Sequence, residues 1–181
     1  MEAHRILTRI PDGKWGAGPA LPGNRDRIIE TAGPIMEELL QATGESVQLY
    51  EVSGTTRTCI ATREPEAGLH NVVPVGRQLP LTSGSAARVI AAFADIHVPD
   101  ATFSEHDIEL AKEDGYSVSI EEREAGLASI SAPVFDGAGT FIAALSISGS
   151  AERFRPSPAD KFAPTLTAAA QKLSDALAAD A

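Results

Sequence analysis

Three successive segments of the chain each carry a pair of serines separated by one residue, and each segment has the character of a β-strand. The segments are Tyr116–Ile120, Leu127–Phe135 and Thr140–Ser148, and their pairs are Ser117/Ser119, Ser129/Ser131 and Ser146/Ser148. Residues i and i+2 of a strand share a face, so the serines of each strand point to one side. Apolar neighbours such as Phe141, Leu145 and Ile147 then point to a core on the other side. The turn Asp136–Gly139 joins the last two segments, which predicts an antiparallel sheet with one hydroxyl-rich face.

The hydroxyl-rich face has two interpretations. It can be the solvent-facing side of an antiparallel sheet, which is a common arrangement. It can also be a covered polar pocket. Neither Leu127–Phe135 nor 140–149 contains a charged residue, whereas a solvent-facing surface usually includes lysine or glutamate. The composition therefore favours the pocket.

Helices are predicted at both ends of the chain and between the strands. The spacing of apolar residues predicts helices over 24–43, with Asn24 as N-cap and Gly44 as the stop, and over Thr82–Phe93, Ser104–Asp114 and Ser157 to about Ala179. Further strands are expected at Ser46–Val52, Arg57–Arg63 and within 71–79. The fold class is α+β, with an antiparallel sheet flanked by helices at both ends of the chain.

The helix over Thr82–Phe93 opens on Ser83-Gly84-Ser85-Ala86. Its first turn combines unpaired backbone N–H groups, the positive end of the helix dipole and small side chains, which suit a carboxylate or a phosphate. An ordinary serine-capped helix is the alternative explanation of the same residues.

Composition excludes several classes of protein. A net charge of −10 argues against non-specific binding to nucleic acid. Cys59 is the only cysteine, so no intrachain disulfide can form. No apolar stretch approaches the length of a membrane span, so a cytoplasmic protein without a membrane partner is expected. Residues 105–124 hold eight acidic residues against Lys112 and Arg123, which is typical of a solvated surface.

An enzyme is the main alternative from another class. The sequence contains no G-x-S-x-G, H-E-x-x-H or phosphate-loop spacing. Cys59 could pair with one of the four histidines, and His97 and His106 lie near acidic residues that could ligate a metal. A buried, inert thiol and a solvated surface are the preferred interpretations, so no catalytic residue, metal or cofactor is expected. A module that serves only for dimerisation is a third possibility.

Two motifs in the same order resemble the C-terminal effector-binding domain of IclR-type bacterial transcription regulators. The stretch GYSVSIEEREAGLASISAPVFDGAGTFIAALSISGS, residues 115–150, is similar to the signature of that family nearly position for position. The stretch VGRQLPLTSGSAARVIAA, residues 75–92, and the segment LLQATGESVQLYEV, residues 39–52, are similar as well. The resemblance covers residues 24–178.

The resemblance implies a GAF-like α+β domain that binds a small organic acid or a related metabolite and forms homodimers or homotetramers. The family's ligand-contacting positions fall on Asn71, Ser85, Ala86, Ser119, Ser129, Ser146 and Ser148. Several of these depart from the family pattern: Ser85 replaces a common glycine, Ser119 a frequent acidic residue, and Asn71 an apolar residue. The resemblance therefore implies a pocket rich in hydroxyl groups, and it does not identify the ligand.

The first 23 residues are expected to form a unit of their own. Family members carry an N-terminal winged helix-turn-helix, and residues 1–23 resemble only its wing hairpin and linker, with strands at Ile6–Ile10 and from Trp15 around the turn Pro11–Gly13. Residues 24–181 are the expected effector-binding domain. We expect no specific contact with DNA by this chain unless a winged helix is supplied.

Overall fold

The computed structural model describes residues 7–9, 15–17 and 22–179. Its helices are α1 (Pro22–Thr43), α2 (Ser85–Phe93), α3 (Glu105–Asp114), α4 (Ala151–Phe154) and α5 (Pro158–Ala179). Its strands are β1 (Leu7–Arg9), β2 (Trp15–Ala17), β3 (Ser46–Ser53), β4 (Thr56–Arg63), β5 (Gln78–Pro80), β6 (Ser117–Ile120), β7 (Leu127–Phe135) and β8 (Phe141–Ser150).

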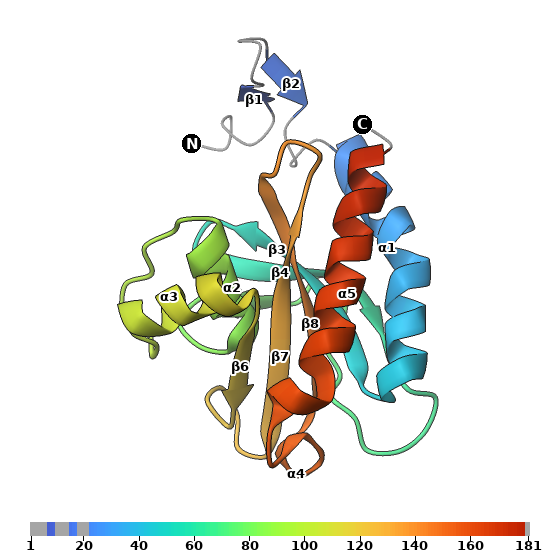
Figure 1. The fold of residues 1–181 in the computed structure, drawn as a ribbon, viewed down its shortest axis with the longest axis vertical. Coiled ribbons are helices and arrows are strands. Elements are labelled where there is room, and N and C mark those ends of the chain that lie inside the picture. The colour runs from blue at the N-terminus through green and yellow to red at the C-terminus, as the bar shows by residue number, and fades with distance from the viewer. Residues whose placement is uncertain (1–6, 10–14, 18–21, 180–181) are drawn as a thin grey trace.

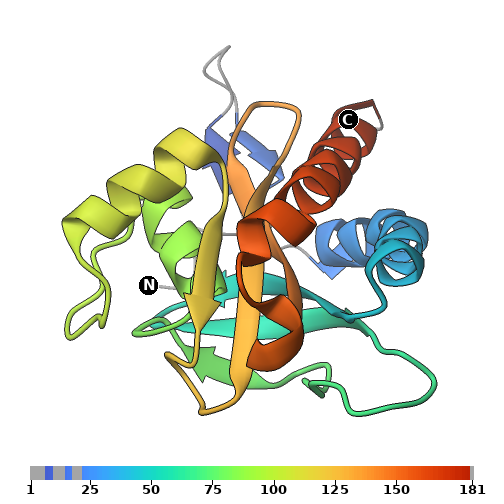
Figure 2. The same ribbon diagram turned by 60° about the horizontal axis from the view of Figure 1, so that its bottom comes forward.

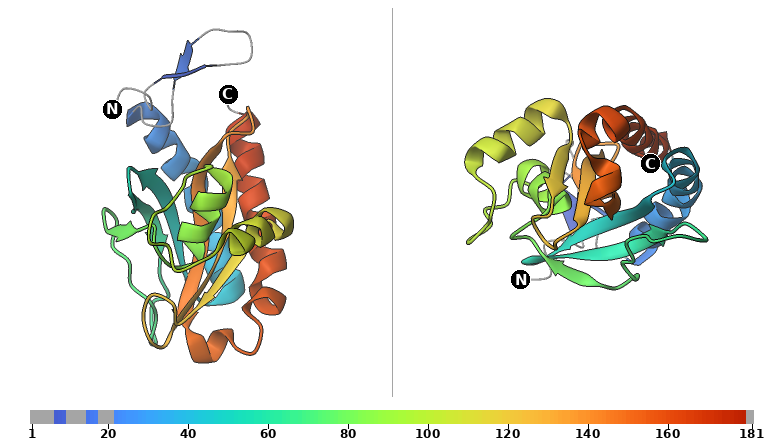
Figure 3. Two further views of the ribbon diagram at one scale, coloured as in Figure 1. Left: turned by 90° about the vertical axis from the view of Figure 1, so that its left-hand side faces the viewer. Right: turned by 90° about the horizontal axis from the view of Figure 1, so that it is seen from below.

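Strands β3 to β8 form one sheet in the order β5-β4-β3-β8-β7-β6, in which every neighbouring pair is antiparallel (Figure 1). Helices α1 and α5 cover one face of this sheet, and α2 and α3 cover the other (Figures 2 and 3). The arrangement confirms the predicted α+β class, with helices from both ends of the chain packed against an antiparallel sheet. None of the described helices combines the length and apolarity needed to cross a membrane.

Two apolar clusters lie on opposite faces of the sheet. The larger one packs α1 and α5 against the sheet and includes Leu145 and Ile147, as predicted. The smaller one lies beneath α2 and contains Tyr50, Cys59 and Ile90. The prediction for Phe141 was wrong, because this ring packs against the smaller cluster.

A β-bulge explains the position of Phe141. The register of β7 and β8 pairs Val134 with Ala143 but Phe135 with Phe141, so one step on β7 matches two steps on β8. The additional residue reverses the alternation of side chains at this end of β8. The rings of Phe135 and Phe141 consequently meet edge to face, with centroids 6.5 Å apart.

The boundaries of the helices differ from the prediction at three places. Helix α1 begins at Pro22, so Asn24 lies inside it and is not its N-cap; proline suits a first turn, where its missing N–H costs nothing. Helix α2 begins at Ser85, because Gly84 adopts φ 96° and is the N-cap. The short helix α4 was not predicted. For α3 the prediction is confirmed at both ends: Ser104 caps it, and Gly115 ends it with φ 77°.

The N-terminal strands β1 and β2 pair antiparallel, with Leu7 opposite Ala17 and Arg9 opposite Trp15. This agrees with the predicted pairing of two short strands. The predicted strand ends Ile6 and Ile10 and the turn Pro11–Gly13 lie outside the described residues.

Candidate functional site

The strand register aligns the six serines into two rows across β6, β7 and β8. One row is Ser119, Ser129 and Ser148, and the other is Ser117, Ser131 and Ser146. On β3 the rows continue into Ser46 and Gln48. Five of the six serines are buried, Ser131 completely, so the rows are not a solvent-facing sheet surface.

Helix α2 is tied to these rows through the hydroxyl of its first residue. Ser85 Oγ lies 2.6 Å from Ser129 Oγ and 2.8 Å from Ser131 Oγ, and Ser131 donates to Ser146 Oγ at 2.9 Å. No side chain caps α2, so the interpretation as a serine-capped helix is wrong. The N–H groups of its first turn have no partner within the helix. The helix N-terminus therefore lies directly on the hydroxyl-rich face.

A second chain of hydrogen bonds crosses the face at Ser148. Asn71 Nδ2 donates to Ser148 Oγ at 2.8 Å, and Ser148 Oγ donates to Gln48 Oε1 at 2.8 Å. Asn71 belongs to the segment between β4 and β5, so this bond connects that segment to the serine rows.

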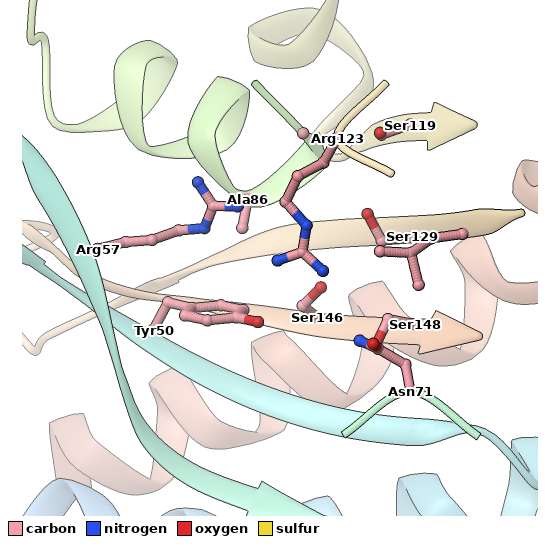
Figure 4. Close-up of a pocket in the computed structure, with 11 residues that line it drawn as sticks. Tyr50, Arg57, Asn71, Ala86, Ser119, Arg123, Ser129, Ser146 and Ser148 are labelled. Carbon is pink, nitrogen blue, oxygen red and sulfur yellow. The ribbon is translucent and has the colours of Figure 1, made fainter. Parts of the chain in front are cut away.

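A small cavity lies between the start of α2 and the serine rows (Figure 4). It is lined by Tyr50, Arg57, Asn71, Gly84, Ala86, Ser119, Arg123, Leu127, Ser129, Ser146 and Ser148. Six of the seven residues predicted for the site thus line one cavity. The seventh, Ser85, lies next to it and bonds Ser129. The cavity volume is about 20 Å³, which is room for about one water molecule.

Arg57 is a buried guanidinium at the site that no sequence motif predicted. It comes from β4, has 3% of its surface exposed, and donates through Nη1 to the carbonyl oxygens of Pro80 and Ser83. Its Cζ lies 5.4 Å from the ring centroid of Tyr50, a cation–π contact. Its buried Nε has no hydrogen-bond partner in the part of the chain that the structure describes. No carboxylate of the described residues forms an ion pair with it.

Arg123 is the second guanidinium of the cavity and was also missed. It comes from the connection between β6 and β7, and Figure 4 shows its side chain directed into the cavity, between Tyr50 and Ser129. It makes no hydrogen bond or ion pair with another described residue. Its neighbours in sequence are fixed: Arg88 of α2 binds both oxygens of Glu122, and Arg155 binds Glu121.

The protonation states give the cavity a positive charge. Burial is the main reason that the pKa of Arg57 falls to about 10, a value at which it is still cationic at neutral pH. Burial likewise raises the pKa of Tyr50 to about 12, so this phenol stays neutral. No lining residue is acidic. The cavity therefore offers hydroxyl groups, a helix N-terminus and two cations.

The other residues considered for chemistry lie elsewhere. Cys59 is buried, its Sγ faces the carbonyl oxygens of Ala61 and Val73, and burial raises the pKa of its thiol to about 11. It is the buried thiol that the sequence favoured. Asp107 belongs to the capping box of α3. Within the described part of the chain, no group of three or more potential metal ligands comes together.

The chain is similar to a set of bacterial transcription regulators. The family described as "Bacterial transcriptional regulator IclR C-terminal" matches residues 24–175. The HTH-type transcriptional repressor AllR of Salmonella typhimurium is 30% identical over 159 residues, which are 78% of this chain and 58% of that protein. The chain thus spans less than two thirds of the length of this curated relative.

Solved structures give the same assignment. A transcriptional regulator of the IclR family from Rhodococcus sp. superimposes with a TM-score of 0.67 at 28% identity, over 98% of this chain and 76% of that one. The C-terminal domain of the E. coli transcriptional regulator KdgR gives a TM-score of 0.69 at 26% identity, over 83% and 98%. The fold and the family match agree with the resemblance of residues 75–92 and 115–150 to this family. The chain belongs to the IclR family of bacterial transcriptional regulators, whose C-terminal domain it matches.

Proposed function

We propose that this domain is the sensor of a transcription regulator and that it binds a small organic acid in the cavity between α2 and the serine rows. The observation that carries the proposal is the bond between Ser85 at the start of α2 and Ser129 on the sheet. It brings a helix N-terminus, which favours an anion, next to a face of hydroxyl groups, which recognise polar atoms. The ligand-binding residues of the proposal are the seven predicted ones, together with Arg57 and Arg123.

The proposed affinity is micromolar. A helix N-terminus favours a negative charge by roughly 0.3–1 kcal/mol, and each hydrogen bond to a charged group adds on the order of 1.5–3 kcal/mol. Loss of translational and rotational freedom offsets much of this gain. The ligand also needs more room than the about 20 Å³ of the unliganded cavity, so a lining side chain has to move.

A thermal-shift screen of small acids against their neutral amides tests the proposal. A ligand at a hundredfold excess over its Kd stabilises the fold by about 2.7 kcal/mol. We expect a subset of acids to raise Tm and their amides not to.

Ser119→Ala should reduce the shift in Tm, because this hydroxyl lines the cavity and makes no hydrogen bond to another described residue. Ser53→Ala, on an exposed position at the end of β3, is the matched control. A complete lack of response to the acids argues for a purely structural module.

We also propose that the domain self-associates, as a homodimer or homotetramer. The apolar stripe of α1 does not support this, because Ile35, Met36 and Leu39 are buried in the domain's own core. The support comes from Leu69 and Val75, which are 86% and 62% exposed. Light scattering at tens of micromolar should show an oligomer, and Leu69→Asp should shift it towards monomer.

In the proposed regulator, ligand binding in the cytoplasm controls attachment to DNA. For this chain by itself we expect no specific binding to duplex DNA, since its net charge of −10 opposes contact with phosphates. Sequence-dependent retardation of an operator fragment that persists in high salt would contradict this expectation.

A further inference from the structure

Two cations that form no ion pair with a described residue converge on the small cavity. Arg57 enters from β4 and Arg123 from the β6–β7 connection, and Figure 4 shows both guanidinium groups directed towards the centre of the cavity. Burial is the main cause of the lowered pKa of Arg57, and the like charge of Arg123 lowers it further. Buried charges are normally paired, because an unpaired one retains most of its desolvation cost. Arg57 is buried and Arg123 is partly buried, and we expect their missing partners in the ligand.

The two arginines differ in how they are held. Arg57 is held by the carbonyl oxygens of Pro80 and Ser83 and by the ring of Tyr50. Its Nε has no partner among the described residues. Arg123 has no such bonds, although the backbone on its N-terminal side is anchored through Glu122. A ligand can displace the Arg123 side chain without breaking a hydrogen bond. Its withdrawal would open the space that the cavity lacks.

We propose that Arg57 and Arg123 form a clamp of one fixed and one movable guanidinium, and that the effector is a small dicarboxylate. One carboxylate binds Arg57 and the start of α2, and the second binds Arg123 after its side chain has swung aside. Carboxylate oxygens that are not bound by the two guanidinium groups face Ser129 and Ser148. This inference rests on the proposed function and narrows its ligand from any small acid to a dianion.

The charges at the site separate a dianion from a monoanion. A monocarboxylate neutralises one guanidinium and leaves the other facing it across the cavity. A dicarboxylate neutralises both. Charge-assisted hydrogen bonds from a guanidinium are among the stronger ones in proteins, so the second carboxylate should raise the affinity by roughly 10- to 100-fold.

Calorimetry with pairs of ligands that differ only in charge tests the clamp. The probes are malonate, succinate and glutarate, each compared with its half-amide, in which a neutral amide replaces one carboxylate. For the unmodified chain we expect at least one dicarboxylate to bind roughly 10-fold or more tightly than its half-amide. Arg123→Gln should remove this preference by weakening the dicarboxylate, and should leave the half-amide nearly unchanged.

Two further variants keep the test interpretable. Arg77→Gln removes the same charge from an exposed side chain outside the cavity and should retain the preference. Arg57→Lys retains the buried charge and should weaken both ligands of a pair, because lysine cannot reproduce the fork of a guanidinium. Thermal unfolding without ligand should show that Arg123→Gln folds as well as the unmodified chain.

The outcomes distinguish this proposal from the more general one. Equal affinities within every pair, or a preference that survives Arg123→Gln, would overturn the clamp. So would the absence of binding by all three dicarboxylates. If a monocarboxylate from the thermal-shift screen still binds in those cases, the sensor function stands without the clamp. If no acid binds at all, both proposals fail.

Discussion

The hydroxyl of Ser148 donates a hydrogen bond to Oε1 of Gln48, a residue one hundred positions earlier in the chain, at 2.8 Å. Gln48 is completely buried, and its Nε2 has no hydrogen-bond partner among the described residues. Ser148 also accepts from Asn71 and lines the cavity. Ser148 therefore has two roles. Its hydroxyl proton satisfies a buried acceptor of the fold, and its oxygen is available to the proposed ligand.

Ser148→Ala should destabilise the unliganded domain. The substitution removes the hydrogen bond to the buried Oε1 of Gln48, for which no other donor is found among the described residues. An unsatisfied buried acceptor costs roughly 1–3 kcal/mol. Urea unfolding followed by circular dichroism measures the loss. Ser119→Ala is the control, because Ser119 is also buried in the serine rows but makes no hydrogen bond to a described residue. Equal losses for the two variants would show that Gln48 finds another donor.

The serine rows could be predicted from sequence because a strand has a period of two. Once Ser129 and Ser131 are placed in an uncharged strand, their common face follows from backbone geometry. The rows cross three strands because β6, β7 and β8 follow one another along the chain. The extension of the rows to Gln48 depends instead on the pairing of β3 with β8, which no local pattern specifies.

The two arginines could not be predicted by the same reasoning. Arg57 stands in a strand among threonines, where a charged residue normally indicates a solvent-facing position. Its burial depends on β5, which pairs with β4, and on the carbonyl oxygens of Pro80 and Ser83, which accept its hydrogen bonds. Arg123 lies in the acidic run Glu121-Glu122-Arg123-Glu124, which is typical of a solvated turn. The structure adds a contact that no local pattern specifies, since Arg88 of α2 binds Glu122, the residue immediately before Arg123.

Gly149→Ala should be strongly destabilising, whereas Gly33→Ala should not. A Cβ at Gly149 would lie 2.2 Å from Oε2 of Glu45, a buried carboxylate that Arg153 holds through two bonds. Overpacking of this kind costs roughly 1–3 kcal/mol or more. At Gly33 the nearest atom is the end of the flexible Arg63 side chain, at 3.1 Å, and alanine in a helix gains up to about 1 kcal/mol. Urea midpoints moving in the same direction for both variants would contradict the prediction.

The capping box of α3 should make part of the stability depend on pH. Asp107 Oδ2 accepts from the backbone N–H and the hydroxyl of Ser104, at 2.7 and 2.8 Å, and these bonds hold the pKa of Asp107 below its ordinary value. A lowered pKa in the folded state means that the ionised form stabilises the fold. The contribution is complete above the unfolded pKa of about 3.9 and is lost as the pH falls through the folded value.

Asp107→Ala should therefore cost about 0.5–2 kcal/mol at pH 7, the usual range for a lost cap, and less at pH 3. Denaturant unfolding at both pH values gives the two differences. Asp114→Ala, at the other end of α3, is the control, because an acid near a helix C-terminus is not stabilising. A penalty for Asp107→Ala that is independent of pH would mean that the hydrogen bonds, and not the charge, supply the stability.

Arg88→Lys should disturb both the fold and the binding of the proposed ligand. Arg88 joins α2 to β6 and to the β6–β7 connection. It donates to Ser117 Oγ at 2.9 Å and to the carbonyl of Val118 at 2.7 Å. It also binds both carboxylate oxygens of Glu122, at 2.8 and 3.0 Å. A lysine ammonium cannot span these acceptors, and the pair is largely shielded from water, with 11% and 29% of the two side chains exposed. We expect a loss of roughly 1–3 kcal/mol in the free energy of unfolding.

The neighbouring ion pair supplies the comparison for Arg88→Lys. Arg155 binds Glu121 in the same connection, but both side chains are about half exposed, at 56% and 43%. Exposed pairs of this kind contribute roughly 0–1 kcal/mol, so Arg155→Lys should change little. A second measurement concerns ligand binding. Glu122 immediately precedes Arg123, so Arg88→Lys should also reduce the rise in Tm that an acid produces. If Arg88→Lys lowers stability but leaves the ligand-dependent shift intact, then Arg88 holds α2 on the sheet without positioning the side chain of Arg123.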